Sequence, residues 1–311
     1  MKSKKIIIGS RSSKLALIYA ERAKKELKNL LKETDIEIKK ITTKGDLIQD
    51  VRLSETGGKG LFCKLIEEEL INKKIDIAIH ALKDLPSIET DGLITNCFLE
   101  RNDPREILIS KNNLDFQKLK KDSIVGTSSF RREFQLKRIR NDLKYKLIRG
   151  NVDSRIKKLT ENLLDAIILS YAGIKSLNLT NNISQIFSIS EIIPSAGQGV
   201  IALQCRKNDN TIIKLLNKIN HKKTHYCVLA ERNVLKILEG DCETAIGVYA
   251  EIIDKKITLE AELFSLDGKQ RFYIKSSKEL NLAAELGKKL VKFLKKNLKI
   301  HIKNNYAYFI Y

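Results

Sequence analysis

Short apolar runs, each followed by a glycine turn and a helix-spaced apolar stretch, recur along the N-terminal two thirds of the chain. Residues 6–8 are apolar, residues 9–13 hold a glycine and three serines, and leucines and isoleucines then recur at helical spacing to residue 31. The same order returns at residues 123–132. Such a pattern indicates a strand followed by a helix. It predicts two α/β units, each built on a parallel sheet.

Further short runs extend both units. Each is apolar or alternates apolar with polar positions, as strands do; they are residues 36–41, 76–79, 145–148 and 166–169. We expect a first α/β domain made of residues 1–99 and 200–217, and a second made of residues 100–199.

The chain changes character from about residue 221. We expect one helix to residue 238, a short loop, strands at 248–252 and 256–264, and a long lysine-rich helix from 278 to about 298. This predicts a smaller third domain, of α+β type, at residues 218–311.

Length and composition exclude several classes of protein. With 311 residues, 42% of them apolar, the chain can form two or three compact domains. No apolar run approaches eighteen residues and the first ten residues are too polar for a secretory signal, so we expect a cytoplasmic protein that does not cross a membrane. Five cysteines without a C-x-x-C pair, and four histidines, argue against a disulfide framework and against a metal site.

The basic residues fall into two groups. The net charge is +20, and most of it comes from lysines spread along the chain, as on solvated faces. Eight of the fourteen arginines, however, lie between Arg101 and Arg155. Guanidinium groups pair with carboxylates and phosphates through two parallel hydrogen bonds. The clustering therefore predicts a cleft for an anionic substrate.

The two strand–turn–helix units each carry an arginine near the start of the helix, Arg11 in the first and Arg131 in the second. A helix N-terminus offers free backbone N–H groups and the positive end of the helix dipole. We expect two anion-binding sites that face each other across a cleft.

Three further positions could carry chemistry. Cys242 lies on a glycine-flanked loop, where a thiol is accessible enough to hold a covalent group. Asp84 follows an apolar strand at the edge where α/β sheets place their sites, although local sequence alone favours a capping role before Pro86. Residues 56–62 are rich in glycine but lack a Walker ending, which predicts a mobile lid over residues 45–60 that bears Lys59.

The chain resembles a known family, the porphobilinogen deaminases, which are also called hydroxymethylbilane synthases. The matching runs extend from the first strand into the third domain; they are residues 57–62, 80–86, 100–105, 125–132, 147–152, 196–199, 230–232 and 238–242. The resemblance implies two periplasmic-binding-protein-like α/β domains with a cleft between them, plus a small C-terminal α+β domain. It also implies a transferase that joins four porphobilinogen molecules head to tail, releases ammonia at each step, and frees hydroxymethylbilane by hydrolysis in haem biosynthesis.

The same resemblance assigns the site. It implies that a dipyrromethane cofactor is attached to Cys242 and that Asp84 stabilises positive charge as ammonia leaves. By the same resemblance, we expect substrate carboxylates to be held by Arg11, Ser13, Arg149 and Arg155. We expect the cofactor to be held by Lys83, Thr127, Ser129, Arg131 and Arg132.

Two departures from the family pattern stand out. The family usually has an arginine after the Ala-Gly-x-Lys run, but here residues 172–175 are followed by Ser176. Cys242 is flanked by Asp241 and Glu243, and two carboxylates beside a thiol tend to raise its pKa and slow attachment.

The sequence also bears on two other classes of protein. A two-domain cleft also suits a periplasmic anion-binding protein, which needs neither Asp84 nor a thiol. A nucleic-acid-binding module predicts stacking aromatics on a basic face, yet aromatic content is 6% without tryptophan. We expect a monomer that binds porphobilinogen and no nucleic acid.

Overall fold

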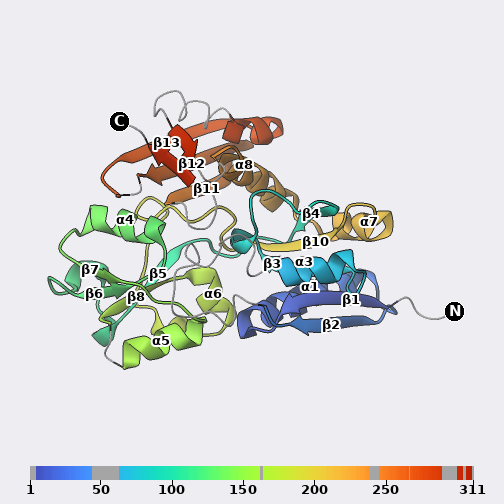
Figure 1. Ribbon diagram of the computed structural model, residues 1–311, viewed down its shortest axis with the longest axis horizontal. Coiled ribbons are helices and arrows are strands. Elements are labelled where there is room, and N and C mark those ends of the chain that lie inside the picture. Colours follow the sequence, from blue (N-terminus) through green and yellow to red (C-terminus); the bar gives the residue numbers. More distant parts are fainter. Residues whose placement is uncertain are drawn as a thin grey trace.

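A computed structural model describes residues 5–43, 63–161, 164–238, 245–265 and 267–288, and the backbone of 300–303 and 306–309. Its first sheet has the order β2-β1-β3-β10-β4, in which β10 runs antiparallel to both of its neighbours. The strands are β1 (Ile6–Arg11), β2 (Ile36–Ile41), β3 (Ile77–Ala81), β4 (Leu93–Phe98) and β10 (Ile201–Arg206). Helices α1 (Lys14–Leu30), α3 (Lys64–Ile71) and α7 (Asn210–Ile219) pack on this sheet (Figure 1).

The second sheet repeats that plan, with the order β7-β6-β8-β5-β9 and with β5 antiparallel to its neighbours. Its strands are β5 (Glu106–Ser110), β6 (Ile124–Gly126), β7 (Lys144–Lys146), β8 (Ala166–Ser170) and β9 (Gln185–Ile186). Its helices are α4 (Phe130–Ile139), α5 (Val152–Thr160) and α6 (Tyr171–Ser176).

The fold class is confirmed, because each half is a five-stranded sheet flanked by helices. The prediction of purely parallel sheets was wrong for β5 and β10. The chain crosses from the first sheet to the second at residues 99–105 and returns at residues 196–200. Strand β5 follows the first crossing and β10 follows the second, and each enters its sheet from the end opposite to that of its neighbours. The predicted strand at 145–148 is the three-residue β7, which begins one residue earlier.

The two crossing segments lie side by side. Leu99 N donates to Ile201 O at 3.1 Å, and Asn102 N donates to the carbonyl of Gly199 at 2.8 Å. Gly199 has a φ of +80°, and a Cβ there would lie 2.4 Å from Asn102 O. The close approach of the segments therefore requires glycine.

The third unit has a three-stranded antiparallel sheet on which helix α8 packs, and the helical residues 283–288 join the same core. Its elements are α8 (Lys222–Leu238), β11 (Ile246–Ile253), β12 (Lys256–Phe264) and β13 (Arg271–Glu279), followed by the short hairpin β14 (Ile300–Lys303) and β15 (Tyr306–Phe309). The predicted helix from residue 278 was wrong at its start. Residues 271–279 form strand β13, in which exposed and half-buried side chains alternate and which pairs with β12.

The third unit contacts both crossing segments through buried Glu231 on α8. This carboxylate forms an ion pair with Arg101 at 2.5 Å and accepts hydrogen bonds from Gly197 N at 2.7 Å and Ala250 N at 2.8 Å. Figure 1 shows the unit resting on both α/β halves. The domain boundaries stated above stay a prediction.

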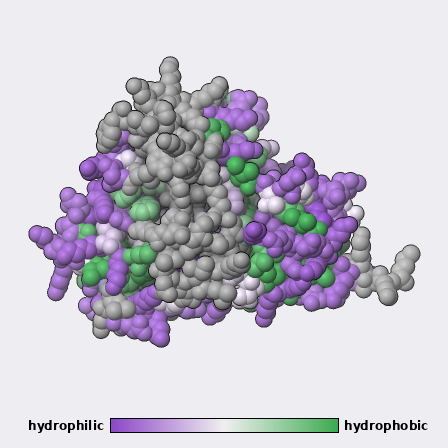
Figure 2. Space-filling view, viewed as in Figure 1, coloured by the Kyte–Doolittle hydropathy of each residue, from purple (hydrophilic) through white to green (hydrophobic). Residues whose placement is uncertain are grey.

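Hydrophilic residues cover most of the outer faces drawn in colour in Figure 2. Among the described residues, no helix is both long and apolar enough to span a membrane.

Candidate active site

Asp84 lies at the carboxyl end of β3, in the short 3-10 turn η2 (Leu82–Asp84). Leu82 is buried and its N–H donates to the carbonyl of Val200 at 3.0 Å, which fixes this turn against the returning crossing segment. Asp84 lines a pocket together with Arg11, Ser13, Tyr19, Cys63 and His80. The structure thus brings together three of the residues that the sequence singled out.

His80 also lines this pocket and is held by a buried network that sequence reasoning missed. Gln204 donates to Glu67 at 2.9 Å, which leaves its oxygen to accept from His80 Nε2 at 3.2 Å. Burial lowers the pKa of His80 to about 4, despite the opposing charge of Glu67. The ring is therefore neutral at neutral pH and donates a hydrogen bond.

The second half contributes the start of α4. Ser129 caps this helix by accepting from Arg132 N at 3.4 Å, and Thr127 accepts from Ser129 N at 3.2 Å. Hydroxyl side chains are preferred at this position because they satisfy free N–H groups of the first turn. The cap places Arg131 and Arg132 on the first turn of the helix, where both are buried.

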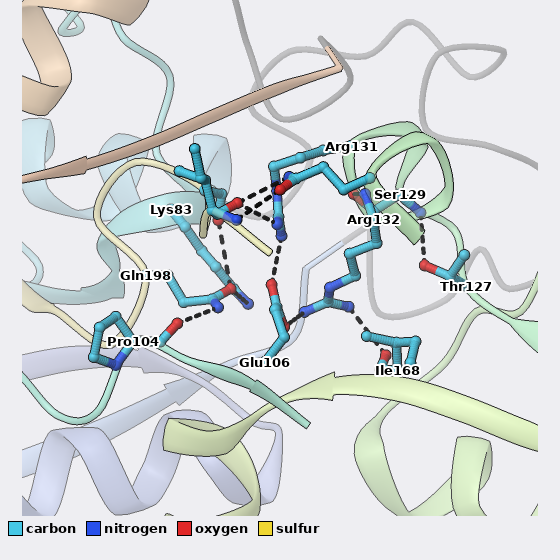
Figure 3. Close-up of polar contacts among 12 residues, drawn as sticks. Lys83, Pro104, Glu106, Thr127, Ser129, Arg131, Arg132, Ile168 and Gln198 are labelled. Carbon is cyan, nitrogen blue, oxygen red and sulfur yellow. Dashed lines mark hydrogen bonds and ion pairs between the residues drawn. The ribbon is translucent and has the colours of Figure 1, made fainter. Parts of the chain in front are cut away.

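Glu106, at the start of β5, pairs with both arginines (Figure 3). Its carboxylate lies 2.6 Å from Arg131 Nη2 and 2.8 Å from Arg132 Nη2, while the arginines also donate to the carbonyls of Ile193 and Ile168. Burial raises the pKa of Glu106, but Arg132 and Arg131 outweigh it and bring the pKa to about 2. Sequence reasoning missed Glu106; the available signal was a carboxylate that begins an apolar strand.

Lys83 extends from η2 towards the same arginines. Its Nζ donates to Gln198 Oε1 at 3.3 Å, and Gln198 Nε2 donates to the carbonyl of Pro104 at 2.7 Å (Figure 3). Burial, and next the charge of Arg132, lower the pKa of Lys83 to about 8, although Asp84 acts in the opposite direction. Lys83 is therefore a cation in a setting that disfavours its charge.

Arg149 and Arg155 complete the basic cluster from the loop before α5 and from α5 itself. Arg155 Nε donates to the carbonyl of Gly150 at 2.9 Å, and Arg149 is buried. Burial, followed by the charges of Arg132 and Arg149, lowers the pKa of Arg155 to about 10, with Asp84 opposing. Asp84 thus acts on one cation of each half, Lys83 in the first and Arg155 in the second.

Two of the predicted site residues, Lys59 and Cys242, lie outside the described residues, as does the predicted lid over residues 45–60. The four described cysteines, Cys63, Cys97, Cys205 and Cys227, are all buried. Burial raises the pKa of each thiol, to about 12 for Cys63, Cys97 and Cys227 and about 11 for Cys205. In the described part of the chain, no group of histidine, cysteine and acidic residues could hold a metal ion.

Comparisons with known proteins identify the family of this chain. Residues 6–214 match the family model described as "Porphobilinogen deaminase, dipyromethane cofactor binding domain", and residues 225–296 match the model of the C-terminal domain of the same family. Porphobilinogen deaminase of Staphylococcus epidermidis is 45% identical over 86% of this chain and 88% of the relative. That of Staphylococcus carnosus is 42% identical over 94% of this chain and 95% of the relative.

Among solved structures, a methionine-binding lipoprotein of Bacillus subtilis matches 73% of this chain and 94% of its own, with a TM-score of 0.43 and 15% identity. The family models together span most of the chain, and the curated relatives exceed 40% identity over nearly their full length. The chain belongs to the porphobilinogen deaminase family.

Proposed function

We propose that this chain is a hydroxymethylbilane synthase, which joins four porphobilinogen molecules head to tail with loss of ammonia and then releases the linear tetrapyrrole by hydrolysis. The carrying observation is the cluster of buried cations beside two carboxylates, Asp84 and Glu106. Asp84 acts on Lys83 and Arg155, whereas Glu106 pairs with Arg131 and Arg132. Burial and neighbouring cations lower the pKa values of Lys83, Arg131 and Arg155. Cations held in this way gain from anionic partners, and pyrrole rings with acetate and propionate groups supply many carboxylates at once.

The residues fit a dipyrromethane cofactor, because basic and hydroxyl donors gather at the start of α4 and on η2 (Figure 3). We assign the cofactor carboxylates to Lys83, Thr127, Ser129, Arg131 and Arg132, and the attachment to Cys242. Arg131 and Arg132 share Glu106, and each also donates to a carbonyl of its own, Ile193 for Arg131 and Ile168 for Arg132. These bonds fix the guanidinium planes before any ligand binds. When bound, the cofactor would supply the pyrrole carbon to which the first unit is joined, and each later unit would be joined to the unit added before it.

Substrate carboxylates are assigned to Arg11, Ser13, Arg149 and Arg155. Asp84, in the pocket with Arg11 and Ser13, is placed to stabilise the positive charge that develops as ammonia leaves. We further propose that Lys59 belongs to a lid, and that the protein is a cytoplasmic monomer that binds no nucleic acid.

The function is tested by adding porphobilinogen to the purified protein. We expect one ammonia released for each porphobilinogen consumed, and a product that becomes a porphyrin after ring closure and oxidation. If protein of the expected holoenzyme mass does not consume porphobilinogen, the proposal is wrong.

Lys83→Met should stabilise the cofactor-free protein. The pKa of Lys83 lies near 8, below the usual 10.5, so the folded state disfavours the charged amine. This cost is fully present below pH 8 and disappears as the pH rises to 10.5. Each pKa unit corresponds to about 1.4 kcal/mol, and water screens part of it, so we expect a gain of about 1 to 2 kcal/mol at pH 7.

The measurement is denaturant unfolding of Cys242→Ser with and without Lys83→Met, at pH 7 and pH 10. Lys256→Met, which removes an exposed lysine from β12, is the control. If the gain in the free energy of unfolding is as large at pH 10 as at pH 7, the charge of Lys83 is not the cause of the gain.

Ser176→Arg should tighten substrate binding. Ser176 occupies the position where the family usually has an arginine, and its neighbour Lys175 is exposed on α6. One charge-assisted hydrogen bond contributes about 1.5 to 3 kcal/mol, or roughly ten- to hundredfold in affinity. Water in the cleft screens part of this interaction, so we expect a gain in affinity at the lower end of this range. The readouts are the apparent KM and the enzyme-bound intermediates; if neither changes, another basic side chain already fills this role.

A further inference from the structure

Arg232 lies on α8 of the third unit and reaches the turn that carries Asp84. Its Nη1 donates to the carbonyl of Leu85 at 2.9 Å, and its Nη2 donates to the carbonyl of Pro86. These two residues follow Asp84 directly in the sequence. One planar guanidinium of the third unit therefore holds two successive carbonyls at the exit of η2, in the first half.

The turn η2 is also held at its entry. Leu82 N donates to the carbonyl of Val200 at 3.0 Å, on the returning crossing segment. Leu82 and Leu85 share a buried apolar cluster with Val228, which lies one helical turn before Arg232 on the same face of α8. Apolar packing and hydrogen bonds thus anchor the turn on both sides.

The backbone at the exit of the turn has little freedom. Pro86 fixes its own φ and restricts the residue before it to extended conformations, and Leu85 accordingly has a ψ of 135°. Lys83 and Asp84 lie between the entry and this exit. Any shift of the turn that moves Asp84 therefore strains or breaks the bonds to Arg232.

Arg232 holds these carbonyls as a largely buried cation. Burial lowers the pKa of Arg232, and the charge of Glu89 opposes this shift. A buried charge is costly unless hydrogen bonds compensate for the lost water. The carbonyls of Leu85 and Pro86 provide such bonds, and a hydrocarbon side chain in place of Arg232 would leave both carbonyls without this donor.

We propose that Arg232 is a positioning residue that fixes η2, and with it Asp84, against α8 of the third unit. The neighbouring Glu231 binds the same helix to both crossing segments, through Arg101 and Gly197 N, so α8 is a firm support for the turn. The inference rests on the proposed function, in which Asp84 stabilises positive charge. A carboxylate stabilises a transition state well only when its position is set in advance.

The first test compares the holoenzyme of Arg232→Met with that of the wild type. Because a misplacement of about 1 Å can lower a rate about a hundredfold, we expect kcat to fall about ten- to hundredfold. The apparent KM should change by less than about twofold, because Arg11 and Ser13 belong to β1 and to the start of α1 rather than to η2. A folded Arg232→Met enzyme with the kcat of the wild type would overturn the proposal.

Intact mass is measured on the same sample and should still include the dipyrromethane. A variant that lacks the cofactor would assign Arg232 to cofactor assembly instead, and would also overturn the proposal.

A double-variant cycle with Asp84→Asn separates positioning from a general loss of structure. If Arg232 acts through Asp84, Arg232→Met should lower the rate of the Asp84→Asn enzyme by less than about threefold. Losses that simply multiply would contradict the proposal. Arg232→Lys keeps the charge but donates from one nitrogen, so its loss of kcat should be smaller and show the same coupling; it serves for the cycle if Arg232→Met does not fold.

Arg206→Met is the matched control. Arg206 also holds two carbonyls, those of Leu70 and Ile75, at 2.9 and 2.7 Å. It ends β10, at the end of the first sheet opposite to Asp84, as the register of β10 with β3 shows. Arg206→Met should lower the melting temperature and leave kcat unchanged. A loss of kcat as large as in Arg232→Met would mean that losing any such arginine has this effect, against the proposal.

Amide hydrogen exchange without substrate tests the positioning independently of the proposed function. The N–H groups of Leu82 and Leu85 are hydrogen-bonded within and beside the turn, so their exchange reports its opening. Exchange of residues 82–85 should be several-fold faster in Arg232→Met than in the wild type and in Arg206→Met. Unchanged exchange would overturn the positioning role even in a fully active enzyme. A wild-type protein that consumes no porphobilinogen would instead refute the proposed function, and the exchange result would then decide on Arg232.

Discussion

Asp84→Asn should leave the fold and the attached cofactor in place and lower turnover about a hundredfold or more. The side chain keeps its size but loses the charge that faces the cations of both halves and stabilises positive charge on the substrate. Removing one well-placed electrostatic group typically costs about 10²- to 10³-fold in rate. The measurement is kcat together with melting temperature and intact mass on the same sample.

Asp91→Asn provides the matched control, because Asp91 is exposed in the turn before β4 of the same half. It should change neither rate nor stability. A capping role for Asp84 makes the opposite prediction, in which Asp84→Asn lowers the melting temperature while turnover stays nearly intact. That result would remove Asp84 from the chemistry.

Cys242→Ser should abolish covalent attachment altogether. We expect the purified wild-type protein to be heavier than its sequence mass by one dipyrromethane, and the variant to have the sequence mass and no activity. A serine hydroxyl is a far weaker nucleophile than a thiolate unless an adjacent base activates it. The burial-raised pKa values of Cys63, Cys97, Cys205 and Cys227 keep those thiols protonated and poorly reactive.

Intact mass and peptide mapping check this prediction. Cys97→Ala, a small change in the core of the first half, should retain the adduct. An adduct found on any of the four buried cysteines, or active protein of unmodified mass, would refute the assignment to Cys242.

Local patterns were enough to predict part of the fold. The strand–turn–helix units at residues 6–31 and 123–132 could be predicted because apolar spacing, glycine turns and capping serines all lie within a few residues of each other. The same local signals placed Arg11 and Arg131 near the starts of α1 and α4. The insertion of β10 between β3 and β4 could not be predicted, because it pairs strands more than a hundred residues apart.

The site shows the same limit. Sequence patterns pointed to Asp84 and the arginines and family resemblance supplied their roles, whereas Glu106, Gln198 and Tyr19 were missed. Each of these three lies beside a partner from another part of the chain: Arg131 for Glu106, Lys83 for Gln198, and Asp84, in the same pocket, for Tyr19. Taken alone, they read as a strand-end carboxylate, a loop amide and a core aromatic on a helix.

The position of β10 has a consequence for synthesis on the ribosome. All strands of the second sheet lie between residues 106 and 186, so that half can form as soon as this contiguous stretch has emerged. The first sheet lacks an inner strand until residue 206 has been made, and β4 has only β10 as a neighbour. Domains generally fold as units during synthesis, and distant pairings form late. The half that begins the chain is therefore completed second. Until about 120 further residues have been translated, one edge of β3, beside the future Asp84 pocket, has no partner strand.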